Sequence, residues 1–150
     1  MRKNFRDANY VKQLNVEDAL TATVYPASGS FIDMTNHRHI VFLVTVGALD
    51  SELTLQVGQD TSATQTASIK DVSGATVTIE ATDDDQTFAI EVEDAKLDLA
   101  NGFRYVTLSV AGAAGANDYA AITAIGWNER HEPVTQPSDF PAANSVRVVG

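Results

Sequence analysis

Residues 38–60 constrain the fold most, because they contain two adjacent runs of strand-type composition. Residues 40–46 (IVFLVTV) are all β-branched, leucine or phenylalanine, which is typical of a strand covered on both faces. Residues 53–59 (LTLQVGQ) alternate apolar and polar positions, which is typical of a strand with one wet face. The short polar link at Asp50 and Ser51 predicts that the two runs form a β-hairpin. Neither run carries a catalytic pattern, which favours a scaffold over an enzyme.

The remainder of the chain repeats this pattern of short strands. Further strands are expected at residues 20–25, 75–80, 88–93, 103–110 and 119–127. Turn-type residues separate them at 26–30, 71–74, 83–85 and 101–102. Helical signal is limited to one or two turns within 7–20 and one turn within 92–99. The expected fold class is all-β, an antiparallel β-sandwich of the jelly-roll kind with an extended N-terminal arm and C-terminal tail.

Three regions are expected along the chain: a basic arm (1–19), the sandwich (20–127) and a tail (128–150). The tail carries three of the four prolines, which block helix and remove backbone donors. It nevertheless ends in the β-prone run Val146-Arg147-Val148-Val149. This run is expected to pair with the body of the protein or with a neighbouring subunit.

The sign of the charge changes between the arm and the body. Residues 1–13 carry a net charge of +3, whereas the whole chain carries −10. An acidic body argues against nucleic-acid binding, which needs clustered Lys and Arg. The arm is either a solvated terminus or a docking element for an acidic surface. The candidate capsid or subunit contacts are Arg2, Lys3, Arg6, Lys12, Val146, Val148 and Val149.

Composition excludes several other classes. The chain has no cysteine, so neither disulfides nor thiolate zinc sites are available to it. No stretch approaches the roughly 20 apolar residues of a membrane helix, and no long apolar core follows Met1–Asp7. A protein made and used without export, and without membrane contact, is therefore expected.

Candidate chemistry is sparse. Zinc could use His37, His39 and His131, but no acid or cysteine accompanies them at a zinc-type spacing. Calcium could use the Asp83–Asp85 turn with Glu91, Glu93 and Asp94, but the order of a calcium loop is missing. No nucleophile motif or phosphate loop is present. We therefore expect no enzyme activity, no cofactor and no metal, and Trp127 is expected to anchor either the core or an interface.

The segments IVFLVTVGAL (40–49), LTLQVGQD (53–60), FRYVTLSVAG (103–112) and AITAIG (121–126) resemble the small virion proteins of tailed bacteriophages. The resemblance spans about 90 residues, 38–127. It implies a capsid decoration (cement) protein, a β-sandwich that binds the major capsid protein as a homotrimer. Such a protein is made in the host cytoplasm and lies on the outer capsid surface of the virion. Two alternatives stay open: a carbohydrate-binding or host-adhesion module of a tail, and a head–tail connector or tail protein.

Overall fold

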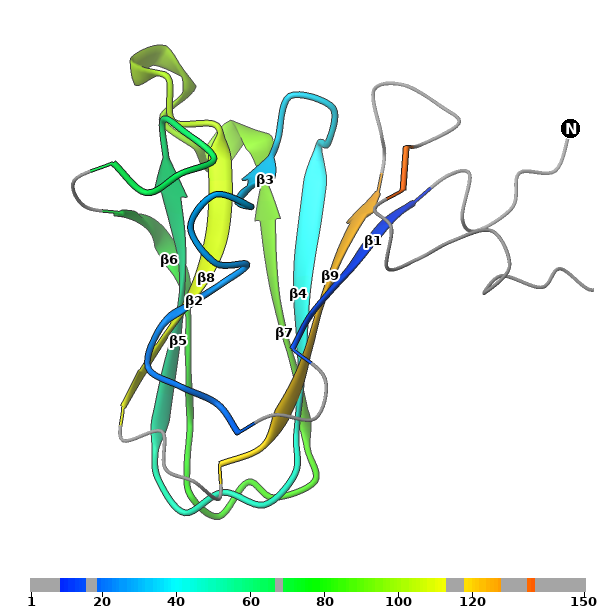
Figure 1. Cartoon of the computed structure of the whole chain (residues 1–150), viewed down its shortest axis with the longest axis vertical. Helices are drawn as coiled ribbons and strands as arrows, with labels where there is room; N and C mark the ends of the chain where they lie inside the picture. The colour runs from blue at the N-terminus through cyan, green and yellow to red at the C-terminus, as the bar shows by residue number, and fades with distance from the viewer. Residues whose placement is uncertain (1–8, 16–18, 67–68, 113–117, 128–134, 137–150) are drawn as a thin grey trace, which may run out of the picture.

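A computed structural model describes residues 9–15, 19–66, 69–112, 118–127 and 135–136. Within them the chain forms nine strands arranged as two antiparallel sheets that face each other (Figure 1). The prediction of an all-β antiparallel sandwich is confirmed. The helical segments of the described residues are two short 3-10 turns, η1 (Asp94–Lys96) and η2 (Leu99–Asn101). No helix in these residues has the length and apolar character needed to cross a membrane.

The four-stranded sheet has the order β1-β9-β4-β7, and the five-stranded sheet has the order β2-β8-β5-β6 with β3 also paired to β8. The strands are β1 (Tyr10–Asn15), β2 (Val24–Tyr25), β3 (Ile32–Asp33), β4 (His39–Val46), β5 (Leu53–Asp60), β6 (Lys70–Ile79), β7 (Thr87–Glu93), β8 (Tyr105–Gly112) and β9 (Ala120–Trp127). In Figure 1 the five-stranded sheet lies on the left and the four-stranded sheet on the right.

Most connections between consecutive strands cross from one sheet to the other. The crossings are β1 to β2, β3 to β4, β4 to β5, β6 to β7, β7 to β8 and β8 to β9. Within the described chain, β5 and β6 alone are consecutive strands that pair with each other. This connectivity, with a four-stranded and a five-stranded layer joined by alternating crossings, is that of a jelly roll, as expected.

The predicted hairpin of residues 40–46 and 53–59 is wrong. β4 pairs with β7 and β9, whereas β5 pairs with β6 and β8 in the opposite sheet. The link 47–52 crosses between the layers and is held by hydrogen bonds that join Gly47 and Ala48 to Tyr119. β4 and β5 therefore each have two neighbours in their own sheet. Their apolar faces meet across the core, whereas in a hairpin the two strands would be neighbours in one sheet.

The core lies between the sheets and is formed by alternate residues of each strand. β4 contributes Ile40, Phe42 and Val44, which are fully buried, and their partners from β5, β8 and β9 include Leu53, Leu55, Val57, Val106, Leu108 and Ile122. Burying side chains of this size stabilises the fold by about 1.5–3 kcal/mol each. The outer faces of the two sheets are consequently left to make other contacts.

The turn expected at residues 71–74 is also wrong, because β6 runs through it. The pairing with β5 changes from Gln56 with Thr76 to Gly58 with Asp71, so β6 holds extra residues at that point. Gly74 has φ +79°, a left-handed conformation that glycine adopts without strain. The result is a bulge that bends β6, and a bulge of this kind resembles a turn in sequence.

The N-terminal region differs from the prediction as well. Residues 10–15 form strand β1, which pairs with β9 from Tyr10 with Gly126 to Gln13 with Thr123, and not a helical turn. Residues 10–15, which were expected to belong to the arm (1–19), are therefore part of the sandwich. The mixed polar sequence of β1 (YVKQLN) suits an edge strand, where Lys12 can reach across to donate to the carbonyl of Ser30 at 3.1 Å.

Candidate interaction surfaces

The outer face of the four-stranded sheet has an apolar centre. Register places Val11, Ile125 and Val41 side by side in one row and Leu43 beside Thr123 in the next. All of these side chains are half-buried, and the described residues form no third layer over them. We call the surface made by Val11, Val41, Leu43, Ile125 and Trp127 the outer sheet face. Residues 40–46 are therefore fully covered on the core side and only partly covered on this one.

Trp127 lies at one end of the outer sheet face and not in the core. Its ring stacks on His39, with 5.3 Å between the ring centroids and 9° between the planes. The imidazole Nδ1 atom of His39 lies 3.2 Å from Glu91 Oε1 and 4.0 Å from Glu93 Oε1. The apolar centre thus has an acidic border along β7. The alternation of β9 indicates the outward position of Trp127 in the sequence. Ala120, Ile122 and Ala124 occupy the inward positions, and Trp127 falls on the other face of the strand.

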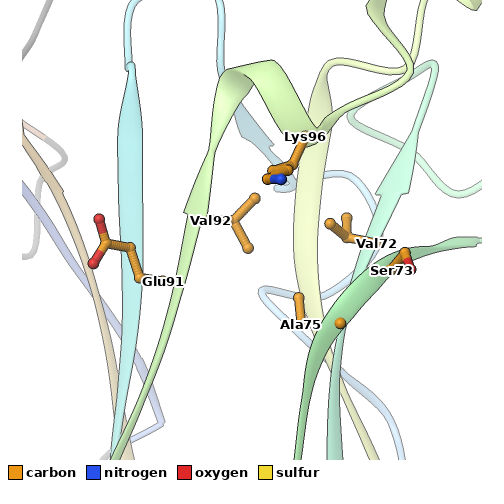
Figure 2. A pocket seen from close by; sticks show the side chains of 7 residues that line it. Val72, Ser73, Ala75, Glu91, Val92 and Lys96 are labelled. Carbon is orange, nitrogen blue, oxygen red and sulfur yellow. The ribbon is translucent and has the colours of Figure 1, made fainter.

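A groove of about 180 Å³ separates the edge strands β6 and β7. Figure 2 shows Val72 and Ala75 of β6 pointing into it from one side and Val92 of β7 from the other, with Lys96 at one end. Glu91 contributes backbone, because its side chain points away from the groove (Figure 2). The groove was not expected from the sequence, since its β6 side is formed by residues 72–75, which belong to the bulge.

The opposite edge of the four-stranded sheet is in contact with Gln136. Its side-chain Oε1 accepts a hydrogen bond from the backbone N–H of Val11 at 3.0 Å, and its Nε2 donates to the carbonyl of Asn9. One amide side chain therefore meets the edge of β1 as a neighbouring strand would. Nothing in the sequence singles out Gln136 for this contact.

The candidate metal residues have structural neighbours. The His37 ring lies 4.7 Å from the ring of Tyr10, whereas His39 stacks on Trp127, so the two imidazoles have different surroundings. No group of three or more His, Cys, Asp or Glu side chains suited to a metal ion occurs in the described part of the chain. His131 lies outside that part.

The acidic turn at residues 83–85 holds loops together. Asp83 Oδ2 accepts from the N–H of Glu80 at 3.0 Å, and Asp84 Oδ1 accepts from the N–H of Leu49 at 2.9 Å. Asp85 has φ +59°, which an aspartate tolerates better than most residues. These contacts give the turn a structural role at the end of the sandwich.

The predicted contact residues fall mostly outside the described residues. Arg2, Lys3, Arg6, Val146, Val148 and Val149 all do. Lys12 is described, and it belongs to β1 of the sandwich instead of a separate arm. The structure consequently leaves the docking role of the arm and the tail as a prediction.

Two buried carboxylates organise loops around the sandwich. Asp118 Oδ1 accepts from the N–H groups of Asp50 and Ser51, in the link between β4 and β5. Asp60 accepts from the N–H groups of Thr61, Ser62 and Thr66 and from the Thr66 hydroxyl. Burial raises the pKa of Asp60, but these hydrogen bonds together hold its pKa below the ordinary value.

No family model and no curated protein matches the chain. Among solved structures, the fold is similar to a chain from work described as "Bacillus endospore appendages form a novel family of disulfide-linked pili". The TM-score is 0.43 at 12% identity, and the alignment covers 85% of this chain and 94% of that one. The present sequence has no cysteine with which to form a disulfide.

Proposed function

We propose that this chain is a structural protein of a phage virion, a capsid decoration (cement) protein that binds the outer surface of the head shell as a homotrimer. Its partners are the major capsid protein and further copies of itself. The resemblance of residues 38–127 to small virion proteins supports this proposal, and so does the jelly-roll connectivity, which viral capsid domains use. Lectins use the same fold, so the fold alone does not distinguish a capsid-binding protein from a glycan-binding one, whereas the surface of the sheet can.

The outer sheet face is the observation that carries the proposal. Val41, Leu43 and Ile125 place apolar side chains at the centre of a broad sheet, and Glu91 and Glu93 border them. A contiguous apolar surface with a polar rim is typical of a protein interface. A surface of this kind suits a partner that is broad and flat, such as another subunit or a shell.

The mechanism is stabilisation by binding. A protein that binds the expanded shell and not its unexpanded or dissociated forms stabilises it by RT ln(1 + [L]/Kd) for each site. A trimer that contacts several capsid subunits at once gains further from multivalency. Rigid jelly rolls suit this task, because little conformational entropy is lost on docking.

The test replaces the centre of the outer sheet face. Val41→Lys combined with Leu43→Lys should abolish binding to expanded shells built from the major capsid protein of the same phage. Thr54→Lys is the matched control, because it adds a lysine to the solvent side of β5 in the other sheet. Cosedimentation measures binding, and circular dichroism checks that each variant keeps its β fold. Unchanged shell occupancy by the double variant would contradict the role of this face.

A separate deletion tests the basic arm. Because β1 begins at Tyr10, the deletion should end at residue 8 and leave the edge strand intact. If the arm docks on an acidic shell surface, its loss weakens binding most at low salt. A glycan array run on the unmodified protein addresses the adhesion alternative. Specific glycan binding without any shell binding would favour a tail adhesion module.

A further inference from the structure

The outer edge of β7 presents a row of backbone groups with no strand beside it in the described residues. The N–H of Asp94 donates to the carbonyl of Arg38, and the N–H of Val46 donates to the carbonyl of Gln86, both at 2.9 Å. In an antiparallel ladder this parity turns residues 86, 88, 90, 92 and 94 towards β4. Residues 87, 89, 91 and 93 therefore direct their N–H and C=O groups away from the sheet.

The groove beside this edge has an apolar floor. Val72, Ala75 and Val92 line it and are only 2%, 7% and 2% exposed. A strand added to the edge of β7 would place alternate side chains over this floor and the others on the solvent side. The inward positions of such a strand would have to be small and apolar to fit about 180 Å³.

The solvent side of the same edge is acidic. The side chains of Glu91 and Glu93 are 51% and 53% exposed, next to the backbone groups that would pair with an added strand. A cation on the outward side of the added strand would face one of them across a distance of about 5 Å. The edge therefore selects the pattern apolar, basic, apolar.

We propose that this edge and its groove accept residues 146–149 of a second copy of this chain. The sequence Val146-Arg147-Val148-Val149 has the required pattern. Val146 and Val148 would lie over the groove floor, and Arg147 would face Glu91, with Glu93 next to Glu91 on the same side of β7. The N-terminal arm fits less well, because Phe5 is the one large apolar residue between its charges.

The path of the chain favours a second copy over the same one. Gln136 is held at the edge of β1, and β1 and β7 are opposite edges of the four-stranded sheet. Three strand spacings, about 14 Å, separate these edges within one molecule, and a tail that crossed them would lie over the outer sheet face, which the proposed function assigns to a partner. In a head-to-tail arrangement the edge of β1 in one copy approaches the edge of β7 in the next, which needs no crossing of the sheet. Head-to-tail contacts of this kind close into a ring, such as a trimer, when the rotation between successive copies is a third of a turn, and otherwise form a filament.

The proposal deepens the self-association included in the proposed function, and it does not depend on capsid binding. Engineered cysteines test it directly, because the sequence contains none. Proteins carrying Ala89→Cys are mixed with proteins carrying Ser145→Cys or Val149→Cys and oxidised. Both tail positions point to the same side of the added strand as Arg147. With Arg147 opposite Glu91, residue 149 lies opposite residue 89 if the added strand is antiparallel to β7, and residue 145 does so if it is parallel. The tail position that cross-links therefore reports the strand direction. Thr23→Cys, exposed beside β2, replaces Ala89→Cys as the control.

The expected result is a cross-link between the two different chains, identified by mass spectrometry and absent with Thr23→Cys. A cross-link that forms only within one chain carrying both cysteines would overturn the proposal, because the tail would then fold back on its own sandwich. No cross-link from Ala89→Cys in any mixture would overturn it as well. Shell occupancy is measured separately, so cross-linked oligomers without shell binding would refute the proposed function alone.

A charge exchange provides the second measurement. Arg147→Glu should weaken self-association about tenfold or more, by placing like charges against Glu91 and Glu93. Combining it with Glu91→Arg and Glu93→Arg should recover most of the lost affinity of self-association. A variant that is merely misfolded would not recover it. Equal weakening in the combined variant would contradict the pairing. Analytical ultracentrifugation across a concentration series gives both values.

Discussion

Asp118 holds the link between β4 and β5 through the backbone of Asp50, whose N–H donates to Asp118 Oδ1 at 2.6 Å. The two residues are 68 positions apart, and Asp118 is fully buried. The same oxygen accepts from the N–H of Ser51 at 3.2 Å. One carboxylate thus fixes the point where the chain passes from one sheet to the other.

Replacing Asp118 should therefore destabilise the sandwich. Asp118→Ala removes the acceptor of two backbone N–H groups and should lower the free energy of unfolding by about 2 kcal/mol. Urea unfolding followed by circular dichroism measures the change. Glu52→Ala, an exposed carboxylate of the same link, is the control and should change little. Equal stability of Asp118→Ala and wild type would show that water replaces the carboxylate.

The network around Asp60 should make stability depend on pH. Its pKa is lowered in the folded state, so its contribution is complete above the unfolded value of about 3.8 and is lost as the pH falls through the lower folded value. Asp60→Asn should cost about 1–3 kcal/mol at pH 7. The difference from wild type should shrink as the pH falls below 3.8.

Urea unfolding of both proteins between pH 7 and pH 2.5 (roughly the acid-unfolding range) checks this behaviour. Asp71→Asn, on an exposed position of β6, serves as the control. A stability difference that stays constant over the whole range would mean that the charge of Asp60 is not what the hydrogen bonds stabilise.

Two glycines with positive φ should respond differently to alanine. A Cβ atom on Gly112, at φ +117°, would lie 2.4 Å from the carbonyl oxygen of Glu52, which is backbone and cannot move aside easily. A Cβ on Gly74, at φ +79°, would meet nothing within 4 Å. Gly74→Ala should cost about 1 kcal/mol from backbone strain alone, and Gly112→Ala more than about 2 kcal/mol. Thermal unfolding ranks them, and the reverse order would contradict the close approach at Gly112.

Trp127 should report on the outer sheet face, because it is the single tryptophan of the chain. If partners cover this face, its fluorescence emission should move to shorter wavelength when the protein associates or binds shells, since water leaves the indole. Trp127→Phe should remove the signal while it leaves association measurable by sedimentation. Association without any emission change would place the interface elsewhere on the molecule.

Alternation in the sequence located most strands but did not show which strands pair. Residues 40–46 and 53–59 are strands, as predicted, yet a polar link of this length serves equally for a hairpin and for a crossing between sheets. The difference lies in contacts far apart in sequence, such as Asp118 with Asp50, which no local pattern encodes. Likewise, Gly74 marks a change of backbone direction, and only the pairing of β6 with β5 distinguishes a bulge from a turn.

The interaction surfaces were harder to predict than the fold. The high proportion of apolar residues in β4 did indicate that the strand has apolar side chains on both faces. Val41 and Leu43 are the apolar residues that lie on the outer sheet face. The groove between β6 and β7 could not be predicted, because it joins strands that are adjacent in space only through the closure of the whole sandwich. The contact of Gln136 with Val11 spans 125 positions and has no local signature.

The contact between Gln136 and β1 makes the two edges of the four-stranded sheet unequal. The side-chain amide of Gln136 is hydrogen-bonded to the N–H of Val11 and the carbonyl of Asn9, so these two backbone groups are not available to pair with a strand of another molecule. The β7 edge has no such guard in the described residues. A molecule with one guarded and one receptive edge has a polarity. Under the proposed edge pairing, copies would join in one direction only, so β7 edges would not pair with each other.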